Sequence, residues 1–253
     1  MKKNWFFYTV LLVFIIHLFA CSADLERKKQ EEDIRAVGEV YMGQGDYTSA
    51  LNELLKAEHI YSEDPHLHND LGLVYMAKDK LLLAIEHFKK AVELKPDYAP
   101  ARNNLGTAYL AVKDWDSAII CFKEVSRDLL YATPHYPLSN LGWAYYNKKN
   151  FIVAEQYYKE ALIIEPKFSV ALHGPGLTYL TTGNAAEAVS YIEKAVRYSP
   201  GVPELQMDLA GAYVLLKEYV KAINIYNKVI EIAPESLMAV QAKREITRIQ
   251  SMK

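Results

Sequence analysis

The chain has 253 residues and a formal net charge of −2. Without Lys2 and Lys3, which belong to the N-terminal segment described next, 27 basic residues remain against 31 acidic ones, and the net charge is about −4. This balance excludes the basic surface that nucleic-acid binding requires. Two cysteines are too few for a disulfide framework. The eleven Gly, ten Pro and nineteen Tyr are typical of helices separated by regularly spaced turns.

The first twenty residues have the pattern of a targeting segment. Lys2 and Lys3 precede an uncharged, mostly apolar stretch from Trp5 to Phe19. This stretch is shorter than the roughly 20 residues of a membrane-spanning helix. We therefore expect residues 1–20 to be a signal peptide and not an anchor helix.

The signal segment ends in Leu18, Phe19, Ala20 and Cys21, which resemble the lipobox of bacterial lipoproteins. The resemblance implies that Cys21 is lipidated and that residues 21–30 form a short lipidated tether. Ser22 stands where an Asp often retains lipoproteins at the inner membrane, so the resemblance also implies the periplasmic face of the outer membrane. The alternative is an ordinary signal peptide cut near Ala20.

The rest of the chain repeats with a period of 34, with one step of 36. Leu-Gly-x-x-Tyr begins at Leu71, Leu105 and Leu141. This is the tetratricopeptide pattern, with two antiparallel helices in each repeat. Three other positions recur: a small residue at Ala50, Ala84, Ala118, Ala154, Ala188 and Ala222, a large one at Leu54, Phe88, Phe122, Tyr158, Ile192 and Tyr226, and proline at Pro96, Pro166, Pro200 and Pro234.

We predict an all-α, right-handed superhelical solenoid of six tetratricopeptide repeats with a C-terminal capping helix at 237–253. Small residues such as Gly72 are expected where helices cross, large residues such as Phe88 are expected to fill the space between repeats, and Cys121 is expected in the core. The cap would bury Leu237, Val240, Ile246 and Ile249. The predicted repeats are 31–64, 65–98, 99–134, 135–168, 169–202 and 203–236.

Two irregularities interrupt the pattern. The third repeat is two residues longer, with its extra length in the junction from Arg127 to Pro137. Pro175 lies inside a predicted first helix, where it costs about 3 kcal/mol because a backbone bond is lost and the ring meets the carbonyl of Ala171. We expect either a kinked or late-starting helix there, or a local adjustment without function.

The signal segment, the six repeats and the longer junction together resemble the pilotins of type IV pili, lipoproteins of the PilF, PilW and Tgl type. The resemblance implies a protein that binds subunits of the secretin, the outer-membrane ring through which the pilus passes, and promotes their insertion and multimerisation. Drift of a surface loop is the other explanation of the junction. A scaffold lipoprotein of another envelope machine, such as barrel assembly or the divisome, and a regulatory subunit of an envelope enzyme are the alternatives.

The tetratricopeptide resemblance also implies a concave groove lined by the first helix of each repeat. Its residues are apolar and aromatic with interspersed amides, which suits an extended or helical apolar segment of a partner protein. About half of them are expected to pack against the neighbouring repeat instead. The implied groove residues are Asn69, Leu73, Met76, Asn103, Thr107, Leu110, Tyr136, Trp143, Tyr146, Asn147, His173, Leu177, Leu180, Met207, Val214 and Leu215.

The sequence predicts no catalytic residues, no cofactor and no metal site. His66 and His68 diverge around a helix and lack a partner at zinc spacing, so both are expected at the surface. Glu31, Glu32 and Asp33 are expected to form a solvated run at a helix start. No phosphate-binding glycine loop or nucleophile elbow occurs. We therefore predict a protein that binds another protein and is not an enzyme.

Overall fold

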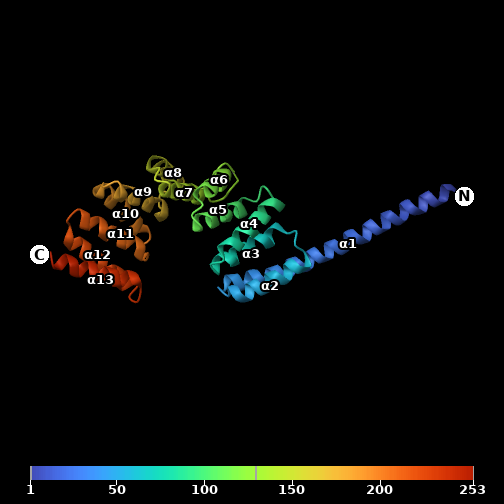
Figure 1. Cartoon of the computed structure of the whole chain (residues 1–253), viewed down its shortest axis with the longest axis horizontal. Coiled ribbons are helices and arrows are strands. Elements are labelled where there is room, and N and C mark those ends of the chain that lie inside the picture. The colour runs from blue at the N-terminus through green and yellow to red at the C-terminus, as the bar shows by residue number, and fades with distance from the viewer. Residues whose placement is uncertain (1, 129, 253) are drawn as a thin grey trace. The chain divides into compact units, whose positions relative to one another are not determined.

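A computed structural model describes residues 2–128 and 130–252, without the side chains of residues 2–21 and 23. The described residues form thirteen α-helices and no strand (Figure 1). The predicted all-α fold of tetratricopeptide helix pairs is confirmed. Two compact units divide the chain, residues 1–113 and 114–253, and each is described by itself.

First and second helices alternate along the chain. The first helices of the repeats are α1 (Lys2–Gly43), α3 (Pro65–Ala77), α5 (Ala99–Ala111), α7 (His135–Asn147), α9 (Ser169–Thr181) and α11 (Pro203–Leu215). The second helices are α2 (Tyr47–Ile60), α4 (Leu81–Leu94), α6 (Trp115–Val125), α8 (Phe151–Ile164), α10 (Ala185–Tyr198) and α12 (Tyr219–Ile232), and α13 (Leu237–Gln250) follows the last pair.

Helix α1 is one continuous helix from Lys2 to Gly43 (Figure 1). It includes the segments predicted to be signal peptide and tether. The side chain of Cys21 lies outside the described residues, so its lipidation stays a prediction. Within the part of the chain that the structure describes, no helix combines the length and the apolar character needed to cross a membrane.

In repeats one, two, four and five, the two helices of the pair cross at a glycine of the first helix, whereas repeat six has Ala210 at this position. A Cβ atom on Gly72 would lie 2.5 Å from the ring of Phe88, and one on Gly142 would lie 2.7 Å from the ring of Tyr158. Real Cβ atoms do not approach a neighbour this closely, so only glycine fits at this position. The same contact joins Gly38 to Leu54 and Gly176 to Ile192.

The turn inside each repeat contains one residue in the left-handed conformation. The next residue begins the second helix as its N-cap, and in three repeats its side chain accepts a bond from the backbone, as Asp46 does from Ser49 N at 3.0 Å. The left-handed position recurs with the sequence period, at Gly45, Asp79, Lys113, Lys149, Gly183 and Lys217.

Pro175 lies inside α9 without shortening it. The helix runs from Ser169 to Thr181, so the expected late start is wrong. Both flanking glycines are buried, and Gly176 makes the pair-crossing contact with Ile192. The proline is therefore accommodated within a regular pair of helices.

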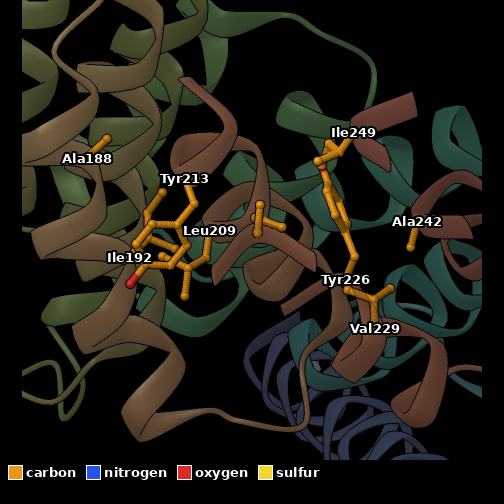
Figure 2. Packing of buried hydrophobic residues seen from close by; sticks show 10 residues of the cluster. Ala188, Ile192, Leu209, Tyr213, Tyr226, Val229, Ala242 and Ile249 are labelled. Atoms are coloured by element: carbon orange, nitrogen blue, oxygen red, sulfur yellow. The ribbon is translucent and has the colours of Figure 1, made fainter. Parts of the chain in front are cut away.

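The C-terminal core joins α10, α11, α12 and α13 (Figure 2). Figure 2 shows Ile192, Leu209 and Tyr213 as one group of side chains and Tyr226, Val229 and Ile249 as another. Tyr213 and Tyr226 are the bulkiest members of this core.

The buried face of α13 differs from the predicted one. Ile249 is buried and Ile246 packs against the core, but Leu237 and Val240 are exposed. The prediction for Leu237 and Val240 is wrong because alanines face the preceding pair in their place, at Ala239 and Ala242. Cys121 is buried, as predicted.

Glycine should have opposite effects at Lys217, which has the left-handed turn conformation, and at Lys228, which lies inside a helix. We expect Lys217→Gly to raise the free energy of unfolding by roughly 0.5–1 kcal/mol, because glycine adopts the left-handed conformation without steric strain. Lys228→Gly, at an exposed position inside α12, should lower it by about 1 kcal/mol. Urea unfolding of the two variants measures both changes, and a loss of stability in both would contradict the argument from strain.

Candidate functional site

Within each of the two units, polar contacts connect first helices of successive repeats. Each rung joins residues that are 35 apart, one more than the repeat. Three rungs form, and we call them the polar ladder: Arg35 Nη1 to Asp70 Oδ2 at 3.3 Å, Asn104 Nδ2 to Asn69 Oδ1 at 2.9 Å, and His173 Nε2 to Asp208 Oδ2 at 2.7 Å.

Within residues 114–253, the rung between repeats four and five does not form. Ser139 in α7 and Gly174 in α9 occupy the equivalent positions, but glycine has no side chain to bond to the serine. The side chain of Ser139 is buried, and its Oγ has no hydrogen-bond partner among the described residues. A buried hydroxyl without a partner costs free energy, so this position favours an external group that can bond to it.

A cavity of about 300 Å³ opens where this rung is missing. The ring of Tyr158 occupies the place of a side chain at Gly174, since a Cβ there would lie only 2.1 Å from the ring. Tyr158 therefore packs against glycines of two repeats, Gly142 and Gly174. We call this cavity the Gly174 hollow, and its lining residues are Ser139, Asn140, Trp143, Tyr158, Val170, His173, Gly174 and Leu177.

Trp143 forms a partly exposed wall of the Gly174 hollow. Its side chain is 39% exposed and stacks on Tyr146, with ring centroids 5.4 Å apart and planes inclined by 15°. The hydroxyl of Tyr146 bonds to Thr181 Oγ1 at 2.8 Å. Because Tyr146 is fixed in this way, Trp143 presents a flat apolar surface in a defined position.

A larger hollow of about 620 Å³ lies between α11, α12 and α13 and extends to Leu180 of α9. Methionine and leucine side chains form much of its wall, and Glu245 and Arg248 of α13 contribute charge. We call it the C-terminal hollow. Its lining residues are Leu180, Glu204, Met207, Asp208, Gly211, Val214, Leu215, Tyr226, Met238, Gln241, Glu245 and Arg248.

Comparison with known families agrees with the helix pairs. Sequence models of the tetratricopeptide repeat match residues 63–128, 135–168 and 179–245, which together make up more than half of the chain. The chain belongs to the tetratricopeptide-repeat family.

Two solved tetratricopeptide structures share the fold at low sequence identity. PilW, described as a widely conserved type IV pilus biogenesis factor, is 20% identical with a TM-score of 0.75, over 82% of this chain and 96% of PilW. PilF of Pseudomonas aeruginosa is 19% identical with a TM-score of 0.72, over 90% of this chain and 100% of PilF. Identities this low show a common fold alone.

Among curated proteins, the BBSome complex member BBS4 of Mus musculus is 32% identical over 208 residues, 82% of this chain and 40% of BBS4. BBS4 of Bos taurus is 27% identical over 119 residues, 47% of this chain and 22% of BBS4. The chain spans less than half the length of these relatives.

In repeats four to six, most predicted groove residues lie at one of the two hollows. Trp143, His173 and Leu177 line the Gly174 hollow, and Leu180, Met207, Val214 and Leu215 line the C-terminal hollow. Asn147 donates to the carbonyl oxygen of Trp143 at 2.8 Å. Tyr136 packs separately, with its ring centroid 5.0 Å from that of Phe168. Partner binding by these residues stays a prediction.

The predicted groove residues of repeats two and three are less accessible. Asn69 is buried in a rung of the polar ladder, and the hydroxyl of Thr107 donates to the carbonyl oxygen of Asn103 at 3.1 Å. Leu73, Met76, Asn103, Thr107 and Leu110 are half-buried. These repeats therefore use part of the predicted surface for their own packing.

Sequence reasoning missed several residues of the hollows, among them Ser139, Gly174, Asp208 and Met238. One signal was present in the sequence. At the position of Gly174, the second, third, fourth and sixth repeats carry a polar side chain: Asp70, Asn104, Asn140 and Asp208. The fifth repeat has glycine there instead. The lining by α13 depends on how the last helix packs, which the repeat pattern does not describe.

An excess of carboxylates surrounds Arg35 at the first rung. The guanidinium forms an ion pair with Glu39, and its Nε lies 3.3 Å from Asp64 Oδ2 and 3.6 Å from Glu31 Oε1. Glu31 is fully buried, so its predicted place in a solvated run is wrong. It lies inside the long helix α1 and not at a helix start.

Burial controls the protonation of two of these carboxyl groups. Burial, followed by the nearby charge of Asp64, raises the pKa of Glu31 to about 7. Burial, followed by the charge of Glu39, raises the pKa of Asp70 to about 6. One arginine does not compensate all of these buried negative charges.

His68 also differs from its predicted surface position. It is buried, and its ring packs against that of His87, with centroids 5.3 Å apart. His66 is half-buried, with Nδ1 3.1 Å from the hydroxyl of Tyr98. The prediction failed because His87, 19 residues away in α4, comes close to His68 only when the second repeat folds.

The contact between Gly174 and Tyr158 predicts that a single methyl group is harmful. Gly174→Ala should destabilise the protein by about 1–3 kcal/mol, because the new Cβ must displace a buried ring. Gly211→Ala is the matched control, since no atom lies within 4 Å of its Cβ position in α11, and it should stabilise by up to about 1 kcal/mol. Thermal unfolding measures whether each variant is more or less stable than the wild type. Equal changes of stability in Gly174→Ala and Gly211→Ala would contradict the close contact with Tyr158.

The buried carboxyl of Glu31 predicts a dependence of stability on pH. Between about pH 4.5 and 7 the folded chain retains a proton that the unfolded chain releases, so this group makes the folded state less stable as pH rises. The Tm of Glu31→Gln, relative to wild type, should therefore rise between pH 5 and pH 8, by several degrees or roughly 1–2 kcal/mol. Glu32→Gln, at an exposed neighbour, should show no such rise, and a similar rise there would contradict the assignment.

Proposed function

We propose that this chain is a lipid-anchored scaffold of the outer membrane that binds secretin subunits of a type IV pilus and promotes their insertion and multimerisation. The observation that carries its binding role is the Gly174 hollow. The proposal for the partner is supported by the shared fold with PilW and PilF and by the lipobox-like sequence that ends at Cys21.

The Gly174 hollow suits one large apolar side chain of a partner. Its volume of about 300 Å³ is at the lower limit of small-molecule sites, and Trp143, Val170 and Leu177 make its lining largely apolar. The hydroxyl of Ser139, which has no hydrogen-bond partner among the described residues, belongs to the same lining. An anchoring side chain seated between aromatic walls is typical of the residues that dominate protein–protein affinity.

The lipid and the hollow have separate roles in this proposal. The lipid on Cys21 would hold the chain at the membrane where the secretin ring forms. The hollow would hold a secretin segment until it contacts another subunit. Loss of the lipid should therefore misplace assembly, whereas loss of the hollow should prevent capture.

Deletion of the gene tests the proposal. Unheated gel electrophoresis of membranes should show that the secretin multimer disappears in the deletion strain and returns with the wild-type gene. Cys21→Ala should lose the multimer or place it in the inner membrane. Trp143→Ala should lose most of the multimer while the chain accumulates normally, because an anchoring contact of this kind contributes at least about 2 kcal/mol.

Tyr198→Ala is the matched control for Trp143→Ala. Tyr198 is a similarly exposed aromatic residue on α10, a second helix that lines neither hollow. This variant should restore the multimer fully. Multimers that persist unchanged in the deletion strain would overturn the secretin proposal and favour a scaffold of another envelope machine.

A further inference from the structure

Three side chains from three successive helices meet in the first two repeats. Glu58 lies on α2, His68 on α3 and His87 on α4. The Nδ1 atoms of the two histidines are 3.0 Å apart, and Glu58 Oε1 lies 3.9 Å from that of His68 and 4.0 Å from that of His87. One potential ligand atom of each residue therefore faces a common point.

The hydrogen bond of His68 determines which of its nitrogens faces this point as a ligand. His68 Nε2 lies 2.8 Å from the backbone carbonyl oxygen of Ser62. A carbonyl oxygen can only accept, so Nε2 carries the proton and, in the neutral ring, Nδ1 has a free lone pair. Metal-binding histidines characteristically donate their other ring nitrogen to such a carbonyl.

A ring contact positions His87. Its ring stacks on that of Tyr75, with centroids 5.2 Å apart and planes inclined by 21°. The ring contacts of His87 and the carbonyl bond of His68 orient both imidazoles before any ion arrives.

We propose that Glu58, His68 and His87 form a Zn²⁺ site. Two imidazole nitrogens and one carboxylate oxygen are a common zinc ligand set, and a water molecule would take the fourth tetrahedral position. Zinc distances of about 2.0–2.2 Å imply ligand atoms about 3.4 Å apart, so the histidines would separate slightly and the carboxylate would move inward.

The surroundings of the three residues permit this adjustment. The side chain of Glu58 is 29% exposed, whereas those of His87 and His68 are 15% and 6% exposed. The carboxylate can therefore move on its flexible side chain, and the imidazoles need to separate only slightly. The same partial exposure provides an entry path for the ion.

Bound zinc would connect the second helix of the first repeat to both helices of the second. Packing and the rung between Arg35 and Asp70 already hold these two repeats together, and a coordinated ion would add a further bond across their junction. Two imidazole ligands also disfavour Mg²⁺ and Ca²⁺, which prefer oxygen ligands. The site thus has a structural role and selects transition metals.

The competing explanation is a hydrogen bond between the two imidazoles without any metal. To separate the two, the full-length chain is treated with a chelator, dialysed and titrated with ZnSO₄ by calorimetry and by thermal unfolding. We expect one Zn²⁺ per chain, a Tm higher by several degrees, and no effect of MgCl₂. Titration with Co²⁺ should give the visible absorption bands of a tetrahedral complex.

Variants locate the ion. Glu58→Gln and His87→Gln should each weaken Zn²⁺ binding at least roughly tenfold and remove the rise in Tm. His59→Gln, at the exposed neighbour of Glu58, is the matched control and should bind as wild type does. Because Glu58 is partly exposed, Glu58→Gln should fold normally in the metal-free state, which a wild-type Tm in chelator verifies.

Two results would overturn the proposal. One is a wild-type chain whose Tm does not respond to Zn²⁺, which would leave the imidazole pair as a hydrogen bond alone. The other is equal weakening of binding in His59→Gln and Glu58→Gln, which would assign the ion to exposed surface groups.

Discussion

The close crossing of two helices at a glycine is the contact on which the helix pairs of repeats one, two, four and five depend. Gly72 meets the ring of Phe88, and Gly142 meets that of Tyr158, at distances that exclude any side chain on the first helix. The two backbones come close together because the second helix contributes a large side chain at the crossing and the first helix contributes only a glycine. The left-handed turn residue and the N-cap that follows it then connect the pair over a short distance. These constraints together explain why the sequence repeats at a fixed length.

A fixed pair of helices also determines which residues of neighbouring repeats can meet. Within each unit, first helices lie next to one another in an offset that places residues 35 apart in contact, and polar side chains at three such pairs of positions form the polar ladder. The Gly174 hollow follows from the same geometry. Gly174 removes one partner, and the large ring of Tyr158 keeps the helices from closing the gap. The cavity is therefore bounded by the contacts that stabilise the fold, which makes its shape difficult to lose without unfolding a repeat.

The sequence was sufficient to predict the fold, because the spacing of Gly, Ala, large apolar residues and Pro reflects contacts within one repeat. The hollows depend on contacts between repeats. Side chains of neighbouring first helices meet when they are 35 residues apart, whereas equivalent positions of the aligned repeats are 34 apart. The pairing of Ser139 with Gly174 was therefore not visible in the alignment of repeats. Burial of Glu31 and His68 was missed for a related reason: each is covered by residues from other helices. On α13, apolar residues were expected to face the core, but Ala239 and Ala242 fit the close approach to α12 and leave Leu237 in solvent.

The buried clusters of ionisable side chains and the two hollows belong to different repeats of this chain. The Arg35 cluster and the group of Glu58, His68 and His87 belong to repeats one and two, whereas the Gly174 hollow and the C-terminal hollow belong to repeats four to six. Each repeat interacts mainly with its neighbours, so protons and metal ions would act on the stability of the N-terminal repeats without altering the walls of either hollow. The proposed zinc site and the proposed capture of secretin are consequently independent: Glu58→Gln can abolish the first and leave the second intact, and Trp143→Ala can do the reverse.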